Sequence, residues 1–437
     1  MLMFVIFGAV LLLMLLGVST AVTMGFASIA TFLFAGGDPT RLFLVPQRMF
    51  AQVSGITLMS IPFFLLMGNL MTVGGVSKSL FGFGRVCLGH RWGGLSNAAI
   101  VACVVMAAMS GSAAACAAGI GMIAINEMTK SGYGRPFSCA TIAAGGALGP
   151  IIPPSITLIL YAGLTSTSVN ALFEAGVLPG LLLGLAFMPG LLLGIMFMGW
   201  SSWVSARRNY AKTEPAPWRE RLQAFREAFF ALMTPVIVMG GMFGGIFTAT
   251  EAAAVASLYV MFLGFFVYGT LRVRDLPAIF WNTVEQTAKV MFVIATAGFF
   301  QYVLLYTRIP QQAIAFMSTS FATAAPVLLL IIALLVLMGC FMEGTAILLI
   351  TVPIFVPLAK SFGYDIVQLG IVMCISLAIG VLTPPVGLNL YVMSSITGEH
   401  VLAIAKEAVG YVLIMIIVAI LVAFIPELSL GFAKWVP

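Results

Sequence analysis

Long apolar runs fill most of this chain, and short polar segments separate them. A run of about 18 apolar residues or more is long enough to cross a bilayer as a helix. Two other segments mix apolar and basic positions at helical spacing and predict helices that lie at the membrane surface, at 40–53 and 275–289. The predicted spans are 3–17, 18–36, 55–75, 171–200, 228–246, 249–269, 290–306 and 402–425. The pattern predicts an all-α polytopic membrane protein.

Two further apolar stretches, residues 96–128 and 324–358, carry a polar notch near their middle. Each arm has only about 15 residues, which is too short to span a bilayer comfortably. Each stretch therefore predicts a re-entrant helical hairpin whose tip lies inside the membrane. The predicted tips are Ser110, Gly111 and Ser112 in the first hairpin, and Glu343, Gly344 and Thr345 in the second.

Two apolar runs contain a double proline with a glycine four residues upstream of it: residues 149–154 and 380–385. Proline has no N–H to donate, and its ring clashes with the preceding helical turn. The residue before each proline is also pushed out of the helical region. Residues 137–163 and 366–394 therefore predict broken helices. The freed carbonyls must find protein, water or an ion as partners.

These landmarks repeat along the chain. The hairpin tips are offset by 342 − 109 = 233 positions and the double prolines by 384 − 153 = 231 positions. Five spans per half is an odd number, which forces the halves into opposite orientations, so we expect an inverted-topology repeat. The repeats would cover 1–202 and 228–437, joined by a basic linker, 203–227. Positive charge places this linker and a Lys78–Arg91 loop in the cytoplasm, and both termini outside.

Composition agrees with this class: 62% of residues are hydrophobic and 8% are charged, whereas a soluble domain carries about 25% charge. The net charge of +6 comes from loop lysines and arginines and does not indicate a nucleic-acid partner. The six cysteines lack metal-ligand spacing, and the only histidines are His90 and His400 in predicted loops. The chain has no P-loop and no cluster of catalytic polar residues. We therefore expect neither ATP hydrolysis nor an intramembrane enzyme.

The tips and breaks are the candidate transport site. A helix that ends presents carbonyls with partial negative charge, and a helix that begins presents N–H groups with partial positive charge. Carbonyl and hydroxyl oxygens suit Na⁺, and the N–H ends suit a carboxylate substrate. The first cation site would use Ser110, Gly111, Ser112, Gly149, Ile152 and Pro153; the second Gly344, Thr345, Gly380 and Thr383; the substrate would contact Ser112, Ser155, Thr157 and Asn389.

The alternative is that the prolines are ordinary kinks and the hydroxyls bond back to their own helices. Two matched breaks beside two matched notches favour a site instead. Few ionisable residues lie near apolar segments. Glu251 at a helix start predicts N-terminal capping, and Glu285 with Lys289 predicts an i,i+4 ion pair. Glu343 has two possible roles, adding charge to the cation site or facing a periplasmic water path.

Five runs of the sequence, together and in order, resemble a known family. They are SGSAAACAAGIGMIAINEM, GPIIPPSITLILYAG, GGIFTATEAAAVA, MEGTAILLITVPIFVP and GVLTPPVGLNLYV. The chain resembles the large membrane (M, DctM-like) subunit of tripartite ATP-independent periplasmic (TRAP) transporters over nearly its whole length. One departure is Asn126, where many relatives have proline.

The resemblance implies an elevator-type secondary transporter in the bacterial inner membrane, driven by Na⁺ rather than ATP. It implies a periplasmic substrate-binding protein and a small four-helix membrane subunit, which we expect as a separate chain. The implied substrates are C4-dicarboxylates, sialic acid and similar organic acids, and the family's Na⁺ sites would fall on the tips and breaks named above. The alternative function is a stand-alone Na⁺- or H⁺-coupled di- or tricarboxylate carrier of related architecture.

Overall fold

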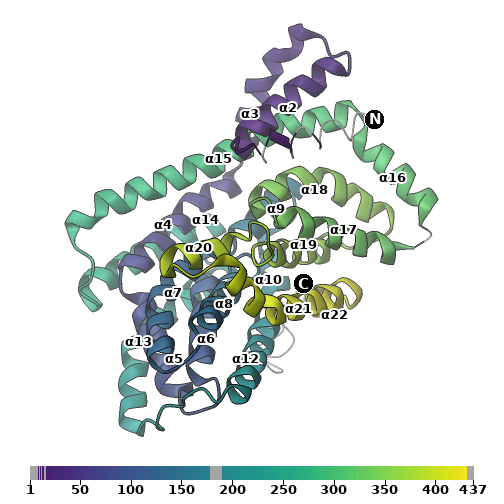
Figure 1. Cartoon of the computed structure of the whole chain (residues 1–437). Coiled ribbons are helices and arrows are strands. Elements are labelled where there is room, and N and C mark those ends of the chain that lie inside the picture. Colours follow the sequence, from purple (N-terminus) through teal and green to yellow (C-terminus); the bar gives the residue numbers. More distant parts are fainter. Residues whose placement is uncertain are drawn as a thin grey trace.

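The computed structural model describes residues 16–177, 189–321 and 323–430, together with residues 8, 10, 12 and 13. These residues form helices joined by short turns, and no strand occurs among them (Figure 1). Most of the predicted span 3–17 lies outside the described residues. The predicted span 171–200 is described only at its ends, as α10 (Val169–Val177) and α12 (Pro189–Arg207).

Within the described part of the chain, six helical stretches are long and apolar enough to cross a membrane. Shorter apolar helices accompany them. The prediction of an all-α membrane protein is therefore confirmed for these residues. The long stretches contain α4 (Ser60–Val73), α13 (Trp218–Phe243), α14 (Ala249–Phe262), α15 (Leu276–Tyr306), α18 (Gly344–Ser361) and α21 (Val401–Phe424).

The segment from Lys78 to Arg91 is not the loop that was predicted, because most of it forms α5 (Val76–Leu88). Its cytoplasmic side stays a prediction. The helix buries Leu80 and Phe81, among others, and leaves its basic residues outside. In the sequence, the basic residues interrupt the apolar run, so the segment was interpreted as a loop. The pattern is that of an amphipathic helix, in which only one face is apolar. A sharp joint at Gly75, with φ of +75°, connects α4 to α5. A Cβ at Gly75 would lie 2.9 Å from the Thr270 methyl carbon, so the joint requires glycine.

The predicted surface helix 275–289 and span 290–306 are a single helix, α15, of 31 residues. No proline or glycine interrupts the sequence at the predicted boundary, so the backbone continues. Figure 1 shows α15 as a long diagonal helix, with α2 (Thr20–Phe34) and α3 (Leu44–Val53) standing out from one end of the molecule. Aromatic packing of Phe32 on Phe299, with ring centroids 6.1 Å apart, attaches α2 to α15.

A further helix, α16 (Ile309–Ser320), follows α15 and was not predicted. The predicted linker 203–227 is mostly helical, since α12 continues to Arg207 and α13 begins at Trp218. The non-helical part between them is held to the turn that follows α5. The Thr213 N–H donates to Gly89 O at 3.1 Å, and Lys212 Nζ lies 3.5 Å from the Trp92 ring centroid. This segment is therefore packed on the helical body.

The two notched stretches and the two proline-containing runs form four helix pairs near the middle of the molecule (Figure 1). In each pair a short non-helical segment separates the two helices. The opposite orientation of the two halves and their boundaries stay predictions. The pairs are α6 (Gly94–Ser110) with α7 (Ala113–Lys130), α17 (Ala324–Gly339) with α18, α8 (Arg135–Gly146) with α9 (Ile156–Thr165), and α19 (Ile366–Gly380) with α20 (Leu388–Thr397).

Candidate functional site

The first hairpin tip touches the first helix break through backbone atoms. Gly111 has φ of +60°, a left-handed conformation that favours glycine. A Cβ on Gly111 would lie 2.7 Å from the Pro154 carbonyl oxygen, and a Cβ on Gly149 would lie 2.7 Å from the Ser112 carbonyl carbon. Two glycines thus let the α6–α7 tip lie directly against the α8–α9 break.

The second tip and break meet in a similar way. A Cβ on Gly380 would collide with the Cα of Gly339 and lie 2.5 Å from its carbonyl carbon. The Val386 N–H, just after the second double proline, donates to Cys340 O at 3.0 Å. Here too, glycine allows the backbone of the hairpin to contact the backbone of the broken helix.

A small cavity of about 110 Å³ joins these elements. Residues from both halves of the chain line it, together with Leu65 of α4 and Val290 of α15. Thus the structure brings one tip of each half to the same space. The predicted site residues that line this cavity are Gly111, Ser112, Thr157, Gly344 and Thr345.

A larger pocket of about 530 Å³ adjoins the cavity and shares Ser112, Val290 and Glu343 with it. Ser110 lines this larger pocket. Its other polar residues come from α4 and α15, and they were not predicted as site residues: Asn69, Thr72, Asn282, Gln286 and Lys289. The one indication of this pocket in the sequence was Asn69, the single asparagine in the apolar run 55–75. Asn69 Nδ2 donates to Thr283 Oγ1 at 2.9 Å and joins α4 to α15 inside the bundle.

Four predicted hydroxyl ligands bond to backbone near their own helices. Ser110 Oγ donates to Ser112 O at 3.5 Å, and Ser112 Oγ accepts from the Ala115 N–H at 3.4 Å and so caps α7. Ser155 Oγ donates to Pro150 O at 2.6 Å and accepts from the Leu158 N–H at 3.3 Å, so Ser155 caps α9. Thr383 Oγ1 donates to Ile379 O at 2.8 Å. These bonds follow the alternative pattern considered for the sequence. Ser155 and Thr383 do not line the cavity, whereas Ser112 does.

Ile152 and Pro153 also lie away from the cavity lining. They pack beside glycines of neighbouring helices, because a Cβ at Gly190 would lie 2.5 Å from Ile152 Cγ1 and one at Gly176 would lie 2.8 Å from Pro153 Cγ. Pro150 is the residue of the first break that lines the cavity. Gly149 and Gly380 do not line the cavity. They allow the close backbone contacts between each hairpin tip and its helix break.

Asn389 connects the two broken helices instead of lining the cavity. The side chain is fully buried, and Nδ2 donates to Ala143 O of α8 at 2.9 Å. Its Oδ1 is buried and has no hydrogen-bond partner among the described residues. A buried amide oxygen without a partner is costly. This oxygen can therefore accept a donor or contact a cation at the junction of the two halves.

The charged groups fall into two classes. Glu251 forms a capping box with Thr248, whose N–H donates to Glu251 Oε2 at 2.8 Å, and Lys289 Nζ lies 2.6 Å from Glu285 Oε1. Both of these predictions are confirmed. Glu343 is the residue before the first turn of α18 and lines both the cavity and the larger pocket. Both of its possible roles therefore stay open.

The described residues contain no group of three or more His, Cys, Asp or Glu side chains that could hold a metal ion. The residues that line the cavity carry backbone carbonyls, the hydroxyls of Ser112, Thr157 and Thr345, and the Glu343 carboxylate. Hard cations such as Na⁺ are coordinated by oxygens of this kind. The donor set fits a hard monovalent cation better than a transition metal.

Comparisons with known proteins agree on one family. Residues 7–428 match the family described as "Tripartite ATP-independent periplasmic transporter, DctM component". The chain is 39% identical to the C4-dicarboxylate TRAP transporter large permease protein DctM of Pseudomonas aeruginosa, over 94% of each chain. It is 36% identical to the sialic acid TRAP transporter large permease protein SiaM of Vibrio cholerae, over 90% of each.

A longer relative and two solved structures add to this comparison. The chain is 35% identical to the isethionate TRAP transporter permease protein DctMQ of Oleidesulfovibrio alaskensis, covering 98% of this chain and 66% of that protein. It is similar in fold to the Alcanivorax borkumensis YdaH transporter, with a TM-score of 0.60, 14% identity, and coverage of 92% and 90%. It is also similar to Neisseria gonorrhoeae MtrF, with a TM-score of 0.57 at 12% identity, covering 89% and 85%.

Proposed function

Because the chain belongs to the DctM component family of tripartite ATP-independent periplasmic transporters, we propose that it imports an organic acid, driven by Na⁺ and supplied by a periplasmic binding protein. The cavity shared by the two hairpin tips carries this proposal. It offers oxygens for a cation, and the first turns of α7 and α18 offer N–H groups for a carboxylate.

The substrate would enter through the larger polar pocket. That pocket joins the cavity at Ser112 and Glu343 and carries Lys289, the one basic side chain along its lining. A carboxylate passing from the pocket to the cavity would meet this ammonium group and then the helix N-termini. The names of the relatives point to C4-dicarboxylates, sialic acid or isethionate as substrate classes. All of these are anions.

An elevator motion would carry the cavity across the inner membrane. The hairpins and broken helices would move together, because their backbones are in direct contact at Gly111, Gly149, Gly339 and Gly380. The helices α2, α3, α13, α14 and α15 would form the static frame. The small four-helix membrane subunit would be a separate chain that enlarges this frame. The longer DctMQ relative, of which this chain covers 66%, carries a further segment.

The proposal is tested by uptake into proteoliposomes that hold the chain with its membrane partner. We expect uptake only when an inward Na⁺ gradient and the loaded binding protein are both present, because cation binding and substrate delivery are separate requirements. Labelled substrate inside the vesicles is the measurement. Uptake that continues without the binding protein would instead indicate a stand-alone carrier. Uptake driven equally by a proton gradient would contradict Na⁺ coupling.

Ser112→Ala and Thr345→Ala should each raise the Na⁺ concentration that gives half-maximal uptake by about tenfold. Each change removes the hydroxyl of a residue that lines the cavity, and Ser112→Ala also removes the cap of α7. The expected tenfold change corresponds to a loss of about 1.4 kcal/mol of cation-binding free energy. The matched control is Ser395→Ala, because Ser395 is exposed on α20 and its hydroxyl donates to Val392 O of the same helix. Unchanged Na⁺ activation in both cavity variants would refute these tip residues as cation ligands.

A further inference from the structure

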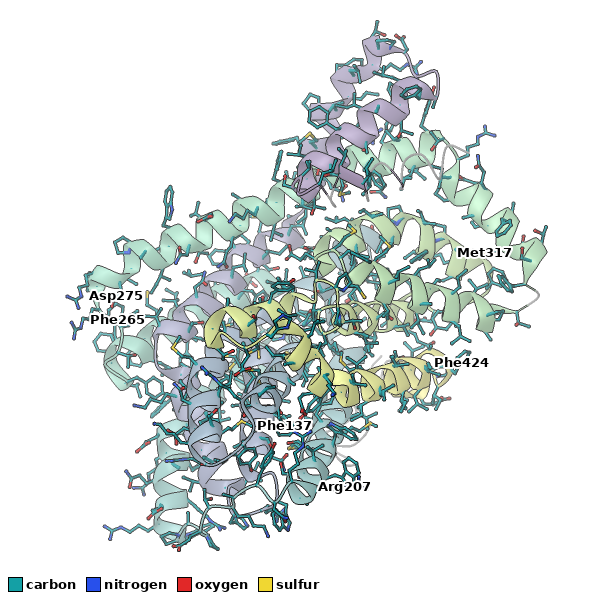
Figure 2. The ribbon with its side chains drawn as sticks, viewed as in Figure 1. Phe137, Arg207, Phe265, Asp275, Met317 and Phe424 are labelled. Carbon is teal, nitrogen blue, oxygen red and sulfur yellow. The ribbon has the colours of Figure 1, made fainter. Side chains whose placement is uncertain are left out.

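A second kind of site lies away from the transport cavity, in a groove of about 440 Å³ between α12 and α21. The C-terminal end of α12 meets the N-terminal part of α21 there. Arg208 Nη2 lies 2.9 Å from Glu407 Oε2, so the charged ends of the two helices stand at the same level. Figure 2 shows Arg207 at the lower end of α12, and Phe424 marks the far end of α21.

The groove is basic at this end and has two positive charges without an anionic partner. Arg208 donates to both carboxylate oxygens of Glu407, at 3.0 and 2.9 Å, which satisfies that pair. Arg207 lies over the Trp203 ring, with Cζ 4.3 Å from the centroid. Neither Arg207 nor Lys406 forms an ion pair with any carboxylate of the described chain. The groove therefore presents net positive charge to whatever occupies it.

The other end of the groove is apolar. Trp200 and Trp203 lie with ring centroids 5.0 Å apart. A Cβ at Gly410 would collide with the Trp200 indole, so the glycine lets this ring lie flat against α21. Val409 and Leu413, four residues apart on one face of α21, are 52% and 54% exposed. These side chains form an uncovered apolar floor next to the basic end.

The level of the groove in the membrane follows from charge and length. The basic segment after α12 places this end of the helices on the cytoplasmic side. Seven residues separate Arg207 from Trp200, a rise of about 10 Å along a helix. The basic end therefore lies at headgroup depth and the apolar end at acyl-chain depth. Tryptophan is also enriched at this boundary.

We propose that this groove binds an anionic phospholipid of the cytoplasmic leaflet. The phosphate of the headgroup lies between Arg207 and Lys406, and one acyl chain runs along Val409 and Leu413. Basic pockets between transmembrane helices on the cytoplasmic side favour such headgroups. A free phosphate ion would use only the basic end and leave the apolar floor uncovered. The bound lipid would hold α12 and α21 together beside the Arg208–Glu407 pair.

The test compares phosphatidylglycerol with phosphatidylethanolamine of the same acyl chains, bound to the full chain in detergent and counted by native mass spectrometry. Arg207→Gln with Lys406→Gln should weaken phosphatidylglycerol binding about thirtyfold. Each basic side chain near an anionic surface contributes about 1 kcal/mol, and about 1.4 kcal/mol is tenfold. The matched control, Arg91→Gln with Arg219→Gln, removes two exposed charges outside the groove and should bind as the wild type does.

A photoreactive phosphatidylglycerol locates the lipid without any substitution. It should label peptides that contain Val409 and Leu413 in the wild-type protein, and Arg207→Lys should keep this labelling because the positive charge remains. Labelling elsewhere only, equal retention of both lipids by the wild type, or unchanged retention by the double variant would each overturn the proposal. Inorganic phosphate that competes fully with the lipid at millimolar concentration would also overturn it, by indicating an ion site.

Discussion

Gly380→Ala is expected to abolish uptake and to lower the stability of the protein, whereas Gly240→Ala should change neither appreciably. The added methyl group at Gly380 would collide with the backbone of Gly339, and no flexible side chain is present there to move aside. Overpacking of this kind costs about 1–3 kcal/mol. The ends of α17 and α19 would have to separate, which breaks the bond from Val386 N to Cys340 O.

The measurement combines thermal unfolding of the purified protein with substrate uptake in vesicles. Gly240 is a strict control, because it lies inside α13 and a Cβ there meets nothing within 4 Å. Alanine in a helix interior is slightly favoured over glycine. Wild-type uptake by Gly380→Ala would show that the second hairpin tip and the second break do not need their direct contact for transport.

The second large effect is expected for Asn389→Leu, which should lose uptake and about 1 kcal/mol of unfolding free energy. Leucine has similar size but cannot donate to Ala143 O, so this side-chain bond from α20 to α8 disappears. The loss in stability stays small because Ala143 O still accepts from the Ala147 N–H inside its own helix. Transport should suffer more, since the junction between the two broken helices loosens and the free Oδ1 is removed.

Asn389→Asp separates these two roles. In its ionised form it keeps a side-chain oxygen at the same place but loses the donor to Ala143 O. Uptake that survives in Asn389→Asp but not in Asn389→Leu would assign the important role to the oxygen. Full uptake in both variants would show that neither the bond nor the oxygen matters. Ser395→Ala on the same helix serves as the control for nonspecific damage to α20.

The positions of the helix ends near the site were predictable because they depend on local chemistry. A missing N–H at proline and a positive φ at glycine act within one helical turn. The first break was expected around residues 149–154, and the structure ends α8 at Gly146 and begins α9 at Ile156. In the second hairpin, α18 begins at Gly344, a predicted tip residue.

Which side chains face the cavity was not predictable, because it depends on packing between distant segments. Within the first break, Pro150 lines the cavity while Ile152 and Pro153 pack toward other helices. No local rule distinguishes these neighbours. The polar pocket was missed for the same reason, since Asn69 meets Thr283 from 214 positions away. Likewise, α5 was not predicted as a helix because its basic residues interrupt the apolar pattern. Its buried face is evident only from its packing against neighbouring helices.

The glycine contacts between tips and breaks have a consequence for how cargo can change. Backbone atoms at Gly111, Gly149, Gly339 and Gly380 hold these elements together, so this scaffold makes little demand on the identity of the side chains around it. The residues that line the cavity and shape its volume, such as Thr157, Val290 and Leu388, belong to a separate layer. The same backbone arrangement can therefore accommodate acids of different size when only the lining residues are exchanged and the four glycines are kept.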